Sequence, residues 1–299
     1  MKAARLQAYG DIDQFKTEDA AVPTPGAGEV LVRLAASAVN HIDLFVRQGF
    51  LAEMIPLALP AVLGGDGAGT VEAVGPDVTA FAPGDRVIVH VGITGKGTHA
   101  DYTVAPVAGV ASLPDSVSFE NGAVLPLAGL TGRQTVDVLG LKGGERVLVA
   151  GALGAVGRVA IQYLKEIGAV PVAGVRPADL DAGRALAGEA IDITLTPQEA
   201  SFDHAVAASQ DAAANTVSHV RDGGRIGGAV QAPEGANPNV AFESIMHHDD
   251  AAQLQGLADA AGRGELSVPV AQTFTLDQLG AAHAALAAGP RGKIVLVHR

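Results

Sequence analysis

The sequence predicts an α/β protein in which a β-rich N-terminal part precedes a doubly wound parallel sheet. The first 120 residues are rich in strand-like runs separated by turn signals. From Glu145 onward, short apolar runs alternate with helical segments, which is the pattern that builds a parallel sheet. The stretch AGALGAVG, residues 150–157, places three glycines between the first of these strands and its helix.

The N-terminal part contains three runs with strand character. They are EVLVRLAASAV, AGTVEAVG and DRVIVHV, at residues 29–39, 68–75 and 85–91. Turn signals such as PGAGE and APGD stand between them. A long helical stretch follows at 119–140, and Pro126 and several glycines interrupt it.

The second half begins with the buried-strand run ERVLVA and a helix whose apolar residues fall on one face, at 155–167. Gly168 stands where a C-cap glycine is expected. Further elements then alternate to the end of the chain. The strands are at 170–175, 191–195, 202–208, 224–230 and 292–298, and the helices at 179–188, 212–220, 249–263 and 276–288. We therefore expect one domain at 121–265 and another at 1–120 with 266–299.

The composition narrows the class of function. The chain has 299 residues and a formal net charge of −12, which disfavours nucleic acid as a partner. It has no cysteine, so disulfides, thiolate zinc sites and thiol nucleophiles are excluded. No apolar run approaches the roughly 20 residues of a membrane span, and the start lacks a signal-like apolar stretch. We expect a cytoplasmic protein that acts on a small molecule.

The glycine loop is the strongest chemical signal in the chain. Gly151 permits a tight turn, Gly154 lets the backbone approach a pyrophosphate, and Gly157 lets the helix pack on the strand. The amides that open the helix would then face the phosphates. The spacing is GxxGxxG rather than GxGxxG, so a strand–turn–helix with packing glycines is the open alternative. The predicted contacts are Gly151, Ala152, Leu153, Gly154, Ala155, Val156 and Gly157.

The end of the second strand favours NADP(H) over NAD(H). It reads Gly174-Val175-Arg176, without the carboxylate that usually binds the ribose hydroxyls of NAD. An arginine can pair with a 2′-phosphate, whereas a carboxylate would repel it. The alternative is that Arg176 is a solvated loop charge.

Three further stretches are VNHIDLFVRQG, LGGDGAGTVEAVG and GLTGRQTV, at residues 39–49, 63–75 and 129–136. Together with AGALGAVG they resemble the medium-chain dehydrogenase/reductase superfamily, and within it the zinc-free quinone oxidoreductase branch related to zeta-crystallin. The resemblance extends to the final GKIVLVH. It implies a GroES-like domain, a Rossmann domain with an active-site cleft between them, and a homodimer.

The resemblance also implies that this chain lacks the zinc ligands of the zinc alcohol dehydrogenases. Asn40 stands where zinc alcohol dehydrogenases have a cysteine, and Gly65-Asp66 stands where they have a His-Glu pair. Asparagine and glycine offer neither thiolate nor imidazole. The run from His247 to Asp250 is interpreted as a solvated loop or helix start, because sequential residues do not share a helix face.

The resemblance assigns roles to residues outside the glycine loop. Asn40 would hydrogen-bond a substrate carbonyl or the ribose, unless it only caps a helix. Thr131 would orient the nicotinamide, or is simply a polar residue of a bent helix. Asp43, Phe45 and Leu51 would line the substrate pocket, although Asp43 could instead pair with Arg47 on a helix. The remaining predicted cofactor contacts are Gly228, Ala229 and Lys293.

Relatives often carry tyrosines at Phe45 and near Leu51, and this chain does not. Phenylalanine and leucine cannot donate a proton, so we expect water to supply it. The sequence thus predicts an NADPH-dependent, zinc-independent oxidoreductase that transfers hydride to a quinone or a related conjugated carbonyl. The alternatives are an alkenal or enone double-bond reductase, and a non-catalytic NADPH-binding sensor or structural protein.

Overall fold

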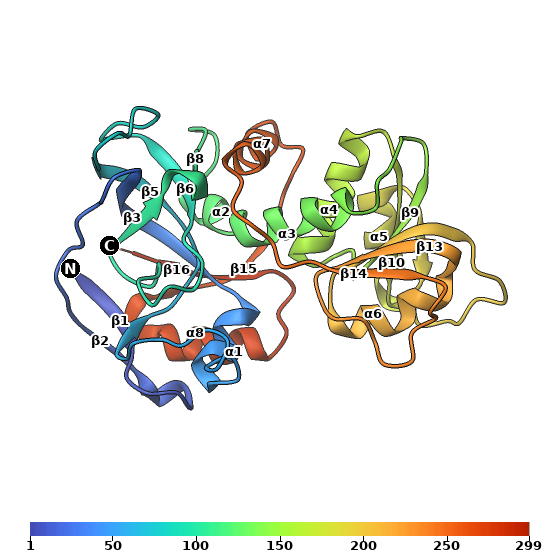
Figure 1. Ribbon diagram of the computed structural model, residues 1–299, viewed down its shortest axis with the longest axis horizontal. Helices are drawn as coiled ribbons and strands as arrows, with labels where there is room; N and C mark the ends of the chain where they lie inside the picture. Colours follow the sequence, from blue (N-terminus) through green and yellow to red (C-terminus); the bar gives the residue numbers. More distant parts are fainter. Residues whose placement is uncertain (299) are drawn as a thin grey trace. The chain divides into compact units, whose positions relative to one another are not determined.

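The computed structural model of the chain describes residues 1–298 and divides them into two compact units. Unit 1 consists of Met1–Leu127 and 249–298, and unit 2 consists of Ala128–His248. Figure 1 labels the elements of both units. Within residues 1–298, no helix is both long enough and apolar enough to cross a membrane.

Unit 1 is built on two sheets. The larger has the order β15-β16-β3-β5-β6-β8, with β7 paired to β3, and the smaller has the order β2-β1-β4. The strands are β1 (Lys2–Leu6), β2 (Phe15–Asp19), β3 (Glu29–Val39), β4 (Ala61–Val62), β5 (Asp66–Val74), β6 (Arg86–His90), β7 (Tyr102–Pro106), β8 (Val110–Ser112), β15 (Val270–Thr275) and β16 (Lys293–Val297). The helices are α1 (His41–Gln48), α2 (Phe119–Ala123), α7 (Ala251–Gly262) and α8 (Leu279–Ala287).

The sheets of unit 1 bury aliphatic side chains on both faces. One apolar cluster joins β3 and β16 to the inner face of α8, including Val39, Leu279 and Ile294. Another fills the space among β3, β5 and β6, including Val32, Val71 and Val89. Because β16 and β3 pair antiparallel with Ile294 opposite Val39, the C-terminal strand lies directly beside the start of α1.

Unit 2 contains one parallel sheet with the strand order β11-β10-β9-β12-β13-β14. The chain winds outward from β9 to β11, then returns to β12 and winds the other way, so β9 and β12 flank the switch point. The strands are β9 (Arg146–Ala150), β10 (Val170–Val175), β11 (Ala190–Asp192), β12 (Phe202–Ala207), β13 (Val220–Gly228) and β14 (Ala241–Ser244). Helices α4 (Ala155–Glu166), α5 (Leu180–Ala187) and α6 (Gln210–Thr216) connect them, and α3 (Pro126–Asp137) leads in from unit 1.

The predicted fold class is confirmed, and the differences are local. The long helical stretch is two helices, α2 and α3, divided before Pro126. Strand β11 stops at Asp192, whose carboxylate accepts hydrogen bonds from the Thr194 amide and hydroxyl and so closes a turn. Seven strands have no counterpart among the predicted elements. They are β1, β2, β4, β7, β8, β14 and β15.

The contact units divide the chain differently from the predicted domain ranges. The predicted nucleotide-binding range, 121–265, includes helix α7, but this helix packs on β8 in unit 1. The Gln255 side chain bonds both backbone groups of Ser112, accepting from its N–H at 2.9 Å and donating to its carbonyl at 3.3 Å. These two bonds tie the helix to the edge of the larger sheet.

Candidate functional site

The glycine loop turns tightly after β9. Gly151 has φ +79°, a conformation that side chains other than glycine rarely adopt. A Cβ on Gly157 would lie 2.4 Å from the Gly151 carbonyl oxygen, so α4 can approach the turn only with glycine there. A Cβ on Gly154 would meet a single atom, that same oxygen at 3.3 Å, and otherwise open space. The turn is therefore closed on its inner side and open above Gly154.

Helix α4 begins at this open side. Gly154 is its N-cap residue, and the Arg158 amide donates to the Gly154 carbonyl at 2.9 Å, which is the first bond of the helix. The amides of Ala155, Val156 and Gly157 precede that bond and have no acceptor within the helix. A bound pyrophosphate would supply acceptors for them, so the turn fits a dinucleotide.

Four strand ends of unit 2 meet in one row beside this turn. Ala150 of β9 is in register with Gly174 of β10 and with Ala207 of β12, and Ala207 is in register with Gly228 of β13. The Ala229 amide continues the ladder by donating to the Ala207 carbonyl at 3.0 Å. The structure thus gathers Gly174, Gly228 and Ala229 with the glycine loop at the carboxyl edge of the sheet, where dinucleotides bind in such folds.

Arg176 follows β10 at the same edge. Its side chain is 74% exposed, and its guanidinium lies 4.0 Å from the Asp211 carboxylate, which is 92% exposed. An exposed pair at this distance contributes little stability, so it does not fix the guanidinium in place. Arg176 is therefore available to an anion from solvent, with one competing carboxylate beside it.

Thr131 lies in α3 of unit 2 and is buried.

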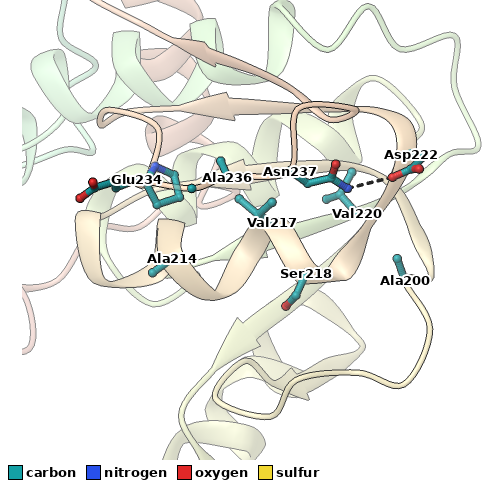
Figure 2. Close-up of a pocket in the computed structure, with 11 residues that line it drawn as sticks. Ala200, Ala214, Val217, Ser218, Val220, Asp222, Glu234, Ala236 and Asn237 are labelled. Atoms are coloured by element: carbon teal, nitrogen blue, oxygen red, sulfur yellow. Dashed lines mark hydrogen bonds between the residues drawn. The ribbon is translucent and has the colours of Figure 1, made fainter.

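A pocket of about 460 Å³ in unit 2 is lined by none of the predicted site residues (Figure 2). Asn237 donates to Asp222 at 2.8 Å on its wall. Val220, the first residue of β13, also lines it, so this pocket lies at the opposite end of that strand from Gly228.

Unit 1 contains a hydrogen-bonded group that we call the Asn40 cluster. Its members are Asn40, Asp43, Asp66, His90 and Lys293. Asn40 is the N-cap residue of α1, yet its side-chain amide points to other partners. Its Nδ2 donates to Asp66 at 2.9 Å, and its Oδ1 accepts from the Lys293 ammonium.

Asp66 and His90 form a buried pair across neighbouring strands. They are directly opposite in the β5–β6 ladder, and His90 Nδ1 lies 2.8 Å from Asp66 Oδ1. That oxygen also accepts the Leu127 amide at 3.0 Å. Burial opposes ionisation of Asp66, but the bond and charge of His90, together with Lys293 and Asn40, outweigh it and lower its pKa. Burial likewise opposes charge on His90, but Asp66 outweighs it and raises the His90 pKa.

Asp43 faces the backbone rather than Arg47. Its carboxylate accepts the Asn40 amide at 2.8 Å, and burial raises its pKa to about 7. Arg47 instead donates to the Gly10 carbonyl and lies 4.0 Å from Asp11, so the proposed pairing of Asp43 with Arg47 on one helix is wrong.

The other two predicted pocket residues lie apart from the cluster. Phe45 is 47% exposed, with its ring centroid 6.4 Å from that of Phe50. Leu51 packs against a small apolar cluster that contains Leu6, Val46 and Leu63.

The placement of three residues differs from what the sequence predicts. Lys293 is a predicted cofactor contact, but its ammonium bonds Asn40 in the structure. Asp66 and His90 have no predicted role and form a buried pair. Two features of the sequence could have indicated them. Asp66 is a carboxylate within the small-residue run GGDGAG, and His90 ends the apolar run RVIVH.

The run from His247 to Asp250 starts a helix. Asp250 accepts the Ala252 and Gln253 amides as the N-cap of α7, which confirms the helix-start interpretation of this run. Among residues 1–298, no group of three or more His, Cys, Asp or Glu side chains is arranged to hold a metal ion.

Comparisons with known proteins agree with this architecture. Residues 26–115 match the family described as "Alcohol dehydrogenase GroES-like domain", and residues 180–296 match "Zinc-binding dehydrogenase". A solved NAD-dependent alcohol dehydrogenase is 30% identical, with all of both chains covered and a TM-score of 0.88. The chain therefore belongs to the medium-chain dehydrogenase/reductase superfamily, with quinone oxidoreductases among its relatives.

Two curated relatives indicate the range of chemistry within that group. The quinone oxidoreductase of Pseudomonas aeruginosa is 38% identical over 171 residues, which are 56% of this chain and 50% of that protein. The trans-enoyl reductase tndF of Aspergillus flavipes is 36% identical over 184 residues, which are 56% of this chain and 53% of that protein. The chain thus spans about half the length of the curated relatives it matches. Membership of the superfamily implies a nicotinamide cofactor.

Proposed function

We propose that this chain is an NADPH-dependent, zinc-independent oxidoreductase that reduces a quinone or a related conjugated carbonyl compound. The observation that carries the proposal is the open glycine turn with unpartnered α4 amides, set at the switch point of the sheet. A reduced nicotinamide supplies a hydride when bound. The acceptor class rests on the quinone oxidoreductases among the relatives.

Several predicted site residues of unit 2 have a specific task in this proposal. The amides of Ala155, Val156 and Gly157 bind the pyrophosphate, and Gly154 leaves room for it. Arg176 binds the 2′-phosphate of NADPH. Thr131, on α3, orients the nicotinamide ring.

Zinc independence rests on the chemistry of the donor set. Asn40 and Gly65, at the positions that resemble zinc ligands, provide an amide and no side chain. The Asn40 amide is also committed to Asp66 and Lys293. Conjugated acceptors delocalise the incoming charge onto oxygen, so hydrogen-bond donors can stabilise it without a Lewis acid.

One experiment separates the candidate functions. NADPH oxidation is followed by absorbance with a panel of ortho- and para-quinones and a panel of enones. Turnover restricted to quinones supports the proposal. Turnover of enones favours the alternative, which the similarity to a trans-enoyl reductase makes specific. Tight NADPH binding without turnover on either panel would identify a sensor or structural protein instead.

A further inference from the structure

Both polar atoms of the Asn40 side chain already have hydrogen-bond partners. Its amide oxygen is taken by Lys293 and its amide nitrogen by Asp66. The side chain is also buried, with 3% exposed. These contacts suit a residue that holds its neighbours in place better than one that grips a carbonyl.

Lys293 is the least buried member of the Asn40 cluster. Asp43, Asp66 and His90 are buried like Asn40, whereas Lys293, at the start of β16, is only partly buried. An ammonium has three N–H donors, and the structure gives one of them to Asn40. The others can serve an incoming oxygen.

The charges around Lys293 come from two elements, β5 and α1. Asp66 of β5 and Asp43 of α1 attract its positive charge, and His41 at the start of α1 also faces it. Desolvation opposes the charge, and the net effect lowers the Lys293 pKa. A lysine in this state is a stronger acid than a lysine in water, so it releases a proton more readily.

We propose that Lys293 is a catalytic residue that donates a hydrogen bond and then a proton to the acceptor oxygen. This inference rests on the proposed function. A bound reduced nicotinamide would supply the hydride and be oxidised, and negative charge would then collect on the acceptor oxygen. An N–H bond of Lys293 breaks as the O–H bond of the reduced product forms. The neutral amine then regains a proton from water.

The rest of the cluster positions this group. Asn40 holds the ammonium through its amide oxygen, and Asp66 fixes Asn40 through its amide nitrogen. His90 in turn bonds Asp66 on the same carboxylate. Lys293 thereby replaces water as the proton source, and it is removed from the predicted cofactor contacts.

The test compares Lys293→Met and Lys293→Arg with the wild type, and uses Lys16→Met, at an exposed lysine of β2, as the matched control. Three quantities are measured. They are NADPH affinity without acceptor, the pH profile of kcat/KM for a naphthoquinone, and the pKa of bound 4-nitrophenol without cofactor. Thermal melts check folding, and the arginine variant preserves the charge should Lys293→Met be unstable.

We expect Lys293→Met to lower kcat/KM about 100-fold, the size of a general-acid contribution. The decline of activity at high pH, where the wild-type lysine loses its proton, should disappear in both variants. NADPH affinity should stay within about twofold, and bound 4-nitrophenol should ionise at higher pH in Lys293→Met than in the wild type. Lys16→Met should match the wild type throughout.

Other outcomes would overturn the inference. A loss of NADPH affinity in Lys293→Met with unchanged kcat would return Lys293 to the cofactor. An unchanged pKa of bound 4-nitrophenol would remove its charge from the acceptor site. If the wild type turned over neither quinones nor enones, the proposed function would fail, while the 4-nitrophenol measurement would still decide the role of Lys293.

Discussion

At the scale of a single residue, the proposed preference for NADPH depends on Arg176. It stands at the end of β10, at the edge where the four strand ends meet, and its side chain is exposed. The carboxylate expected of an NAD site is absent from the end of this strand, but the Asp211 carboxylate approaches from α6. Arg176 would therefore attract a 2′-phosphate, whereas Asp211 would repel it.

Replacing Arg176 with alanine should weaken NADPH binding about 10- to 100-fold and leave NADH binding nearly unchanged. The reason is that a charge-assisted bond to the 2′-phosphate is worth about 1.5–3 kcal/mol, and NADH has no such phosphate. Calorimetric titration with each cofactor measures both affinities. Arg184→Ala, at an exposed arginine of α5, is the control. An equal loss for both cofactors would remove the argument for NADPH.

Replacing Asp211 with asparagine should have the reverse effect. It removes a negative charge near the 2′-phosphate and frees the Arg176 guanidinium from its exposed partner. Because exposed pairs are worth about 0.2–1 kcal/mol, NADPH affinity should rise only about two- to fivefold. The same titration with NADH should show no change. Weaker NADPH binding in this variant would mean that Asp211 orients Arg176 instead of competing for it.

At the scale of elements, glycines in the turn between β9 and α4 serve two different purposes. One glycine allows close packing, and another leaves room for a ligand. Gly157 is needed for packing, because a Cβ there would meet backbone atoms at 2.4 and 2.8 Å. Gly154 is not needed for packing, because its φ is −71° and the space above it is open. The two glycines should therefore fail in different ways when replaced by alanine.

Gly157→Ala should destabilise the protein by about 1–3 kcal/mol, the usual cost of forcing atoms into a packed site. Gly154→Ala should cost about 1 kcal/mol, because alanine is a poorer N-cap residue than glycine. Its methyl group would nevertheless occupy the space proposed for the pyrophosphate, so NADPH affinity should fall at least about tenfold. Urea unfolding and calorimetric titration give the two quantities. A Gly154→Ala protein that binds NADPH normally would show that phosphate does not occupy this turn.

Local patterns predicted the parallel half of the chain well. The helix expected at 155–167 is α4 at Ala155–Glu166, and the strand expected at 170–175 is β10 with the same bounds. Helix α4 has one buried face, and strand β10 is buried except at its first residue. The spacing of apolar residues in each segment therefore reveals the element without reference to distant parts of the chain. The expected C-terminal strand, 292–298, likewise appears as β16 at Lys293–Val297.

The elements and contacts that escaped prediction depend on distant parts of the chain. Strand β15 is half exposed and is held by β16, with no regular apolar alternation of its own. Lys293 meets Asn40 across 253 positions because β16 lies beside β3, whose end leads into α1. Asp66 meets His90 through the register of β5 and β6. A sequence periodicity carries none of these registers, so the Asn40 cluster could not be assembled from it.

At the scale of the whole molecule, stability depends on histidines that are buried in unit 1. His99 and His283 are almost fully buried, with ring centroids 6.4 Å apart. His99 Nδ1 and both ring nitrogens of His283 have no hydrogen-bond partner in the structure. Desolvation lowers the pKa of His99 to about 4, and desolvation with the charges of His99 and Arg47 lowers that of His283 to about 2.

These histidines make the folded state sensitive to acid. Each is neutral when folded but titrates near 6.5 when unfolded, so the unfolded chain binds more protons below that pH. Stability is therefore present above pH 6.5 and is lost as pH falls, by roughly 2 kcal/mol per histidine at pH 5. Asp43 raises stability as pH falls. Because its pKa is raised to about 7 in the folded state, the folded protein takes up a proton at a higher pH than the unfolded chain does. Its gain between pH 7 and pH 5, about 2 kcal/mol, offsets about one histidine.

Because these contributions cancel in part, a variant isolates the histidine effect better than the wild type alone. His283→Leu removes two unpartnered nitrogens and puts an apolar side chain at a buried position of α8, beside the Phe15 ring. The urea-unfolding free energy should change little at pH 7 but exceed that of the wild type by about 2 kcal/mol at pH 5. His248→Gln, at an exposed histidine of unit 2, should leave the difference between the two pH values unaltered. If His283→Leu loses stability between pH 7 and pH 5 as steeply as the wild type, His283 is not neutral in the folded protein.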